Sequence, residues 1–263
     1  MPRLYLALSA AVMAIVFVST LVKSNIKDTD SQSSLYTYCK ESTPTQTTTI
    51  DFLLDPASLA SVNIDRLQTW IDTGNTVLAN SCLNVRREMG LVVETKNSYV
   101  HFLETNDPKR LHHHLKKNEA EQYAFDNHPH RILVFVAPFV DEDIVGYAWP
   151  TLYDDFVLLT TNVMAHTLEH ELGHLAGAEH EKTKLELLKD FLPFVSSKHG
   201  SSAATTCSGK QTVMSQLTHP DSVILAYSSP LTSYQGETCG NEKYADNRSA
   251  IEQYYRQHSL QAP

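Results

Sequence analysis

The spacing of hydrophobic and polar residues changes several times along the chain, and each stretch with one spacing predicts a strand or a helix. Alternating or continuous apolar runs predict strands at 48–54, 85–94, 131–137, 143–150 and 156–160. Apolar residues at helical spacing predict helices at 58–79, 108–125, 163–176 and 242–258. Residues 95–107 follow neither pattern and are expected to form a loop. Strands that alternate with helices in this way predict an α/β domain.

The start of the chain differs in composition from the rest. Residues 4–22 are uncharged and mostly apolar, and they lie between Arg3 and Lys23, which is the form of a secretory signal peptide. The run is also nearly long enough to span a bilayer, so residues 1–24 are either a cleaved signal peptide or a signal-anchor. Residues 25–47 are polar and predict an arm or linker before a domain at 48–263. We expect an exported chain that is secreted, periplasmic or held at the cell surface.

The net charge and the apolar content narrow the function classes. The formal net charge is −9 at pH 7, so the chain lacks the excess of positive charge with which proteins bind nucleic acid. Hydrophobic residues make up 42% of the chain, which suits a globular core rather than disorder. We therefore expect a globular protein without a nucleic-acid partner.

The chain has an even number of cysteines, Cys39, Cys82, Cys207 and Cys239. Behind an export signal, an even number predicts disulfides. Of the three pairings open to two bonds, we expect those that join neighbours in sequence, Cys39–Cys82 and Cys207–Cys239. The alternative role of Cys39, as a cysteine in a short leader, is a latency switch that blocks a functional site.

The stretch 170–180, His-Glu-Leu-Gly-His-Leu-Ala-Gly-Ala-Glu-His, carries the candidate chemistry. His170 and His174 are four residues apart, so on a helix they lie on one face, one turn apart. Gly177 lets the chain leave the helix, because glycine enters positive φ cheaply, and His180 can then return toward the pair. Three imidazoles with an open fourth position describe a catalytic zinc site, since structural zinc sites are closed by four ligands. Glu171 can reach a water molecule at that ion.

This stretch resembles the extended zinc signature of the metzincin peptidases at every fixed position. Metzincins also pass beneath the zinc histidines with a tight turn that holds a methionine, and Met214 in Cys-Ser-Gly-Lys-Gln-Thr-Val-Met-Ser (207–215) is similar to it. Cys207 before this turn, together with the Gly-Tyr-Ala strand at 146–148, resembles the reprolysin (adamalysin)-like members. Gln216 stands where astacins and serralysins carry a tyrosine, so no tyrosine ligand is carried over.

The resemblance implies a fold and a reaction. The fold would be the metzincin zincin-like one: a mixed, twisted, five-stranded sheet with stacked helices, and an active-site cleft above a smaller, irregular C-terminal subdomain. One Zn²⁺ would be held by His170, His174 and His180, and the reaction would be endopeptidase cleavage. Glu171 would take a proton from the attacking water and pass it to the leaving amine.

The resemblance also implies how substrate is held. Gly146, Tyr147 and Ala148 would form an edge strand that binds an extended peptide or protein segment as an added strand. We expect a monomer whose membrane contact, if any, is made through the N-terminal segment. A carboxylate at Glu181 is expected to accept a hydrogen bond or form an ion pair that steadies the end of the site.

Two other functions stay open at this point. One is a zinc-containing binding or adhesion module of the same fold without turnover, and the other is a zinc amidase that acts on cell-wall peptides. The remaining histidines are not expected to be metal ligands: His112, His113 and His114 lie on a solvated helix face, and His166 lies on the surface or beside the site rather than acting as a fourth ligand. Asn162 or Thr161 is expected to cap the zinc-binding helix. No clear calcium loop is seen.

Overall fold

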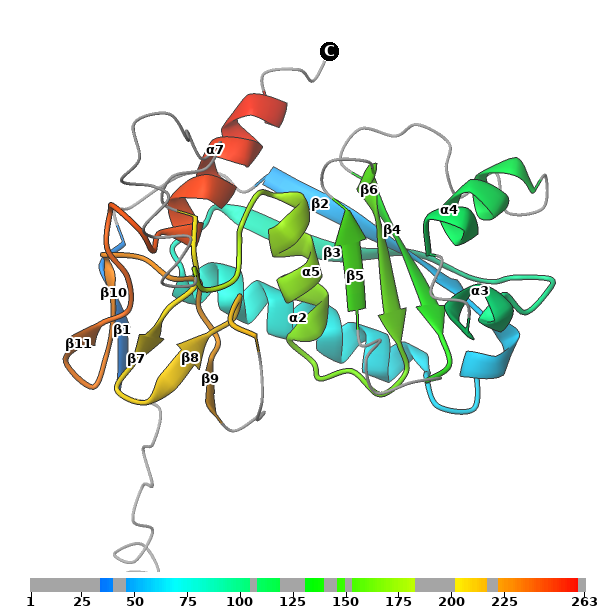
Figure 1. Cartoon of the computed structure of the whole chain (residues 1–263), viewed down its shortest axis with the longest axis horizontal. Coiled ribbons are helices and arrows are strands. Elements are labelled where there is room, and N and C mark those ends of the chain that lie inside the picture. The colour runs from blue at the N-terminus through cyan, green and yellow to red at the C-terminus, as the bar shows by residue number, and fades with distance from the viewer. Residues whose placement is uncertain are drawn as a thin grey trace, which may run out of the picture. The chain divides into compact units, whose positions relative to one another are not determined.

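A five-stranded sheet forms the centre of the molecule. The computed structural model describes residues 34–39, 46–104, 108–118, 131–139, 146–149, 153–182, 202–216 and 222–259, and the elements below belong to one unit, residues 35–263. The strand order is β3-β2-β4-β6-β5 (Figure 1). Its strands are β2 (Gln46–Leu54), β3 (Val85–Glu94), β4 (Arg131–Ala137), β5 (Gly146–Trp149) and β6 (Tyr153–Thr160). Only β5 runs antiparallel to its neighbour among these pairs, so the predicted mixed sheet with an edge strand at β5 is confirmed.

The central strands are apolar on both sides because the sheet is covered on both faces. Successive side chains of a strand point to opposite faces. In β4 the even-numbered residues pack into one cluster and the odd-numbered ones into another: Ile132, Val134 and Val136 against Leu133, Phe135 and Ala137. The continuous apolar run read from the sequence thus corresponds to a strand buried from both sides.

Two helices, α2 (Ile64–Asn80) and α5 (Thr167–Leu175), lie side by side on the first face (Figure 1). The apolar side of α2 contributes Leu67, Trp70 and Ile71 to this layer. The predicted helix start at 58 is wrong. Residues Pro56–Ser58 form a separate 3-10 turn, and Asn63 caps α2 by accepting a hydrogen bond from the backbone N–H of Arg66 at 2.9 Å.

Two further helices, α3 (Val100–Glu104) and α4 (Pro108–Lys117), cover the second face of the sheet. The predicted loop at 95–107 is therefore wrong over the five residues of α3. The prediction of a solvated face for the histidine triplet is wrong for His112, which is 3% exposed, and correct for His113 and His114, which are exposed. His112 is buried because it lies beside Leu111 and Leu115 on the apolar side of α4.

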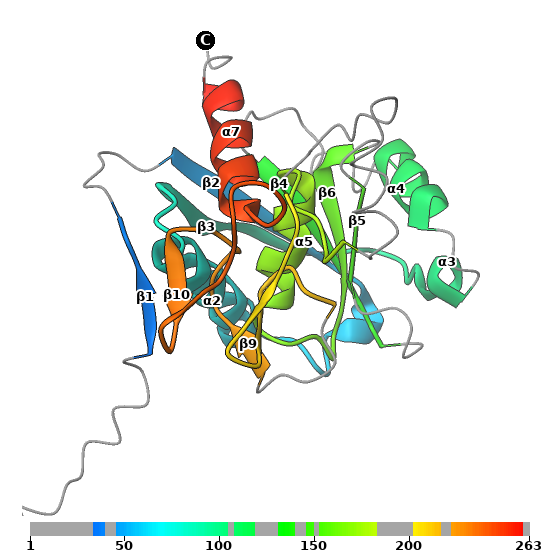
Figure 2. The ribbon, with the colours of Figure 1, turned by 60° about the vertical axis from the view of Figure 1, so that its left-hand side comes forward.

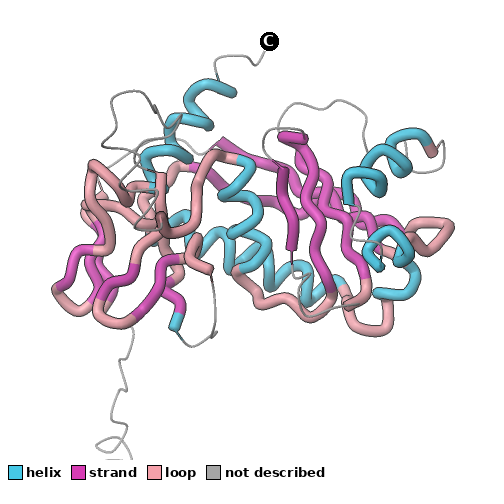
Figure 3. Tube along the Cα trace, in the orientation of Figure 1, coloured by secondary structure: helices cyan, strands magenta, loops and turns pink. Residues whose placement is uncertain are grey.

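After α5 the chain forms short strands joined by loops (Figure 3). One small sheet holds β7 (Thr206–Cys207), β8 (Lys210–Thr212) and β9 (Val223–Ile224), and another holds β1 (Leu35–Thr37), β10 (Thr232–Tyr234) and β11 (Glu237–Thr238). Helix α7 (Asn247–Ser259) follows them and docks through Ile251 and Tyr255. This region matches the smaller, irregular subdomain expected after Gly177.

The predicted polar arm at 25–47 is wrong at two places within the described residues. Leu35–Thr37 forms β1, which pairs with β10 almost two hundred residues later in the chain (Figure 2). Strand β2 already begins at Gln46 rather than at 48. The N-terminal segment therefore contributes a strand to the C-terminal region.

Both disulfides join the cysteines that were expected to pair. Cys39 is bonded to Cys82, with Cα atoms 5.3 Å apart, and Cys207 is bonded to Cys239, with Cα atoms 5.1 Å apart. Cys39 is thus a disulfide partner, which removes the latency-switch alternative. Because disulfides persist in oxidising compartments, the two bonds indicate an extracellular type of environment.

Some predictions fall on residues outside the described ranges. The apolar run 4–22, with the signal peptide or anchor read from it, is one of them. Residues 119–125, at the end of a predicted helix, and residues 143–145, at the start of a predicted strand, are two others. Within the described ranges, no helix has the length and the apolarity that crossing a membrane requires.

Candidate metal centre

Helix α5 carries the first two histidines of the zinc-like stretch. The helix begins at Thr167, later than the predicted residue 163, because turns at 161–162 and 165–166 precede it. His166 occupies the N-cap position without a side-chain capping bond, so the prediction of Asn162 or Thr161 as the cap is wrong. The side-chain oxygen of Asn162 instead accepts a hydrogen bond from the hydroxyl of Thr160 at 2.8 Å.

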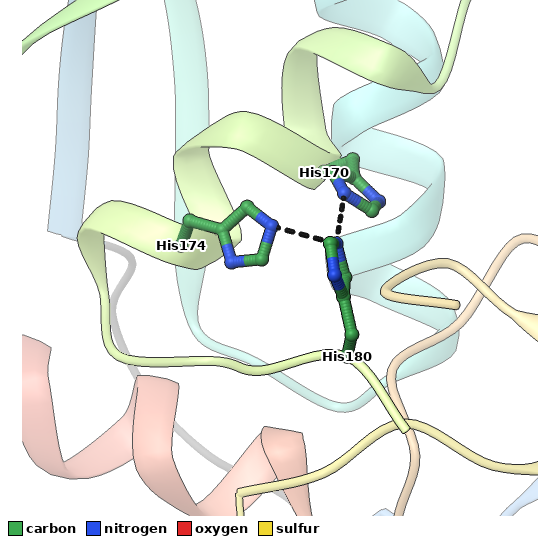
Figure 4. Close-up of side chains that lie close together, drawn as sticks. All are labelled: His170, His174 and His180. Atoms are coloured by element: carbon green, nitrogen blue, oxygen red, sulfur yellow. Dashed lines mark hydrogen bonds between the residues drawn. The ribbon is translucent and has the colours of Figure 1, made fainter. Parts of the chain in front are cut away.

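The structure brings His170, His174 and His180 together. His170 and His174 are one turn apart on α5, and the chain then turns at Gly177, which has a φ of +84°. His180 returns from the following loop and points between the other two rings (Figure 4). The Nε2 atom of His180 lies 3.0 Å from that of His170 and 3.0 Å from that of His174. Within the described residues, these three side chains form the group of His, Cys, Asp or Glu that could share a metal ion.

Backbone carbonyls fix the tautomer of two of the rings. Nδ1 of His170 donates to the backbone oxygen of Val213 at 2.8 Å, and Nδ1 of His174 donates to that of Ala178 at 2.9 Å. Burial, followed by the charge of neighbouring histidines, lowers the pKa of His170 to about 3 and that of His174 to about 4. Both rings are therefore neutral at pH 7, with the Nε2 lone pairs turned toward the group.

This donor set fits a cation. The Nε2 lone pairs of His170 and His174 both point at Nε2 of His180. Because Nε2 of His180 can donate at most one proton, it can form a hydrogen bond with only one of them. Without a cation between the rings, the other contact would place one lone pair against another. A tetrahedral Zn²⁺ with Zn–N bonds of about 2.0–2.1 Å holds its nitrogens roughly 3.3 Å apart, which is close to the observed spacing. The nitrogen-only donor set and the carbonyl partners on the far ring nitrogens are also typical of zinc sites.

Glu171 belongs to α5, and its side chain lies against the edge strand β5. Its side chain is buried, and a Cβ atom placed on Gly146 of β5 would come within 2.6 Å of its Oε1 atom. Burial raises the pKa of Glu171 to about 8. A carboxyl group with a pKa near neutrality can both take up and release a proton at physiological pH.

The predicted methionine turn lies directly beneath the helix. Met214 is fully buried, and a Cβ atom placed on Gly173 would lie 2.5 Å from its sulfur. The glycine between the two ligand turns therefore lets the methionine approach the helix backbone. The neighbouring Val213 supplies the carbonyl that orients His170. This turn therefore packs an apolar side chain against α5 and also positions the His170 ring.

The other predicted residues near the site take varied places. The carboxylate of Glu181 accepts a hydrogen bond from the backbone N–H of Gln216 at 3.2 Å, as expected. His166 is buried and is not part of the three-histidine group. In β5, Tyr147 is exposed, and Ala148 packs against the core of the sheet.

Some residues that support the site were not predicted from the sequence. Glu169, directly before His170, is fully buried and forms an ion pair with Arg87 of β3. Asn247 of α7 pairs its side-chain amide with the backbone of Glu179, the residue before His180, at 3.0 and 3.1 Å. The position of Glu169 three residues before Leu172 on a core-facing helix was a signal, since a buried carboxylate requires a partner.

Comparisons with known proteins give a fold and no family. No protein-family model matches the chain, and no curated protein matches it. A solved structure described as a chaperone–substrate complex is similar over 83% of this chain, with a TM-score of 0.60 and 16% identity. The match covers 36% of that other chain, so this protein spans about a third of its length. At this identity the likeness concerns the fold alone.

Two further structures are more distant. Metalloproteinase-II from Bacteroides fragilis is similar over 87% of this chain and 58% of its own, with a TM-score of 0.45 and 13% identity. Mature mirolysin from Tannerella forsythia, in complex with a cleaved peptide, is similar over 85% of this chain and 94% of its own, with a TM-score of 0.41 and 12% identity. The overlap of these two is too low to transfer their properties to this chain.

Proposed function

We propose that the protein is a zinc-dependent endopeptidase of the metzincin type. The observation that carries the proposal is the convergence of three imidazoles on one point, with two of them oriented by backbone carbonyls. The buried carboxyl group of Glu171 follows the first of these ligands in the chain. This combination is typical of catalytic rather than structural zinc.

The residues have separate roles in this proposal. His170, His174 and His180 hold one Zn²⁺, which supplies Lewis acidity that makes a water molecule nucleophilic at neutral pH and polarises a carbonyl oxygen. Glu171 accepts the proton of the attacking water at its carboxylate and passes it to the leaving amine, so no covalent intermediate with the protein is needed. Met214 closes the floor beneath the histidine rings with an apolar side chain.

The substrate in this proposal is an extended segment of a peptide or protein. β5 is the edge strand of the sheet and packs against α5, and Gly146 lies against Glu171. A peptide that adds to this edge as a further strand would be held beside the catalytic carboxyl group. Export from the cell and a monomeric state are part of the proposal, as is a reprolysin-like relationship, which rests on Cys207 and on the Gly-Tyr-Ala sequence of β5.

A metal analysis combined with peptide digestion tests the proposal. The full chain and its Glu171→Gln variant are incubated with an unbiased peptide mixture, and bound metal is measured in both. We expect one zinc ion in each protein and cleavage by the parent alone, with a loss of at least about 100-fold in the variant. A chelator should stop the cleavage, and the cut sites would give the specificity.

The same experiment separates the alternatives. If both proteins bind zinc and neither cuts peptides, the binding or adhesion module replaces the peptidase. If the parent releases amines only from cell-wall peptides, the amidase replaces it. If neither protein binds zinc, the assignment of the three histidines is wrong.

A further inference from the structure

A network of buried polar side chains contacts α5 on the side of the helix adjacent to the one that carries His170 and His174. The guanidinium of Arg87 in β3 forms two parallel bonds with the carboxylate of Glu169, from Nε to Oε2 and from Nη2 to Oε1, each 3.0 Å long. Arg87 is 1% exposed and Glu169 is fully buried. Nη1 of Arg87 also donates to the hydroxyls of Thr48 and Tyr255. Such a bidentate pair fixes both the distance and the orientation of its partners.

Tyr227 joins the same network from the C-terminal region. Its hydroxyl lies 2.8 Å from Oε1 of Glu169 and 2.9 Å from the backbone oxygen of Glu169. A Cβ atom placed on Gly173 would be 3.0 Å from this hydroxyl, so Tyr227 also touches the helix one turn further on. Its contacts therefore run along α5 for a full turn.

These contact points are directly adjacent to the metal ligands. Glu169 precedes His170, and Gly173 precedes His174, so the side held by the network is about 100° around the helix from the ligand side. A rotation of α5 about its axis would move both histidines and would break the bonds from Arg87 and Tyr227 together. The network thus opposes a rotation that would carry the rings of His170 and His174 away from His180.

The surroundings leave the carboxylate of Glu169 little freedom. A Cβ atom on Gly74 of α2 would lie 3.0 Å from Oε2 of Glu169, so this glycine in the middle of a helix provides the space for the carboxylate. Burial lowers the pKa of Arg87, but its interactions with Glu169, Tyr255 and Tyr227 together raise that pKa above its ordinary value, so the guanidinium stays charged. A charged pair enclosed in this way resists rearrangement, because neither partner can leave the other without being buried alone.

We propose that Glu169, Arg87 and Tyr227 are positioning residues that set the rotation of α5 and thereby the placement of the His170 and His174 rings. This inference rests on the proposed function in that the placed rings are taken as zinc ligands. The network joins β3, α5 and the chain beyond the methionine turn, and Tyr255 adds α7 to it. Glu169, the residue before His170, thereby connects the central sheet with the C-terminal region of the chain.

Substitutions of the network distinguish positioning from simple stabilisation. In the Arg87→Met/Glu169→Met double variant, apolar side chains replace the whole ion pair, a change that often leaves stability unchanged or raised. Tyr227→Phe removes a single hydroxyl and retains the ring. The matched control is Tyr99→Phe, which removes another buried tyrosine hydroxyl, one that accepts a bond from Asn118 at 2.8 Å on the other face of the sheet.

Three measurements are made on the full chain and these variants: the thermal midpoint, zinc affinity by competition with a chelator, and the visible spectrum of the Co²⁺-loaded protein. We expect about 10-fold to 100-fold weaker zinc binding in the double variant and about 10-fold weaker binding in Tyr227→Phe. The Co²⁺ spectrum should change in both. Tyr99→Phe should lower the thermal midpoint without changing zinc affinity or the spectrum. Equal zinc affinity in the parent and Tyr227→Phe would overturn the inference, even if the double variant failed to fold.

A fourth measurement needs no metal and separates this inference from the proposed function. Long-range ¹H–¹⁵N spectra of the metal-free protein show which ring nitrogen of each histidine carries the proton. We expect Nδ1–H on His170 and His174 in the parent, and a mixture of tautomers in Tyr227→Phe but not in Tyr99→Phe. If the parent binds no zinc, the proposed function falls, and this spectrum still decides the positioning role. Unchanged tautomers in Tyr227→Phe would overturn it.

Discussion

Gly146 of β5 lies so close to Glu171 of α5 that a methyl group on its Cα would sit 2.6 Å from the carboxylate oxygen Oε1 and 3.0 Å from the carboxyl carbon. Protein Cβ atoms do not approach other heavy atoms this closely, so Gly146→Ala must displace the carboxyl group or the strand. We expect the variant to lose at least about 10-fold in kcat for peptide cleavage. Zinc affinity should stay within about 2-fold, because the three histidines are not touched.

The control for this prediction is Tyr147→Ala on the same strand. Tyr147 is exposed, so its truncation should alter KM for peptides without displacing Glu171. Steady-state kinetics with one fluorogenic peptide, together with a zinc competition assay, measure both effects. Unchanged kcat in Gly146→Ala would show that Glu171 does not depend on this contact.

The grouping of the three histidines and the sheet could be predicted because their signals are local. The spacing of His170 and His174 fixes a common helix face, and a glycine at position 177 indicates the turn that returns His180. The strands at β3 and β4 have the same bounds in the sequence pattern and in the structure, since continuous or alternating apolar runs there reflect burial. Periodicity within a few residues is sufficient for all of these features.

The supports of the site could not be predicted because their partners are distant in sequence. Arg87 meets Glu169 across 82 residues, and β1 pairs with β10 across almost two hundred residues. A sequence pattern shows that a buried carboxylate needs a partner but does not show which arginine supplies it. The burial of His112 was missed for another reason: three consecutive histidines suggested a polar surface, whereas their places relative to Leu111 and Leu115 decide exposure.

Removal of the metal should lower stability, because a ligand that binds only the folded state stabilises that state. At a free zinc concentration of 100 times Kd the gain is about 2.7 kcal/mol, and for a domain of this size this corresponds to a rise of roughly 5–10 °C in Tm. Thermal unfolding with zinc and with a chelator measures the difference. In His174→Ala the two curves should nearly coincide, whereas in His113→Ala, an exposed position on α4, the zinc effect should be that of the parent.

The burial of His112 should make the folded protein sensitive to mild acid. Burial, followed by the charges of Lys116 and His113, lowers the pKa of His112 to about 4, and its ring packs edge-on against Phe156 at 4.8 Å. Because the unfolded chain binds the proton with a pKa near 6.5, stability contributed by this group is complete above pH 6.5 and falls as the pH drops toward 4. The slope is at most about 1.4 kcal/mol per pH unit.

Urea unfolding of the zinc-loaded protein between pH 4 and pH 7.5 tests this prediction. In His112→Leu, an apolar side chain fills the same place, and the dependence on pH should become shallower over that window. His113→Leu alters the exposed neighbour and should leave the slope close to that of the parent. A His112→Leu variant with the slope of the parent would assign the acid sensitivity to other groups.

The two disulfides should differ in their effect on the metal centre. The Cys207–Cys239 bond closes a segment with a sequence separation of 32, which includes Val213, whose carbonyl orients His170. Replacing both cysteines by alanine should lower the free energy of unfolding by about 3–4 kcal/mol, because the unfolded chain regains the freedom of that loop. The methionine turn then loses its fixed end, so zinc affinity should fall as well.

The Cys39–Cys82 bond is the matched comparison, since it closes a similar separation of 43 residues and joins the chain just after β1 to the chain just after α2, outside the segment that holds Val213. Its double alanine variant should lose about 4 kcal/mol of stability by the same mechanism, while zinc affinity stays close to that of the parent. Denaturant unfolding and zinc competition on both variants test the pair. Equal loss of zinc affinity in both would mean that the metal centre responds to overall stability, whereas loss confined to the Cys207–Cys239 variant would show that this disulfide holds the carbonyl of Val213 in place for His170.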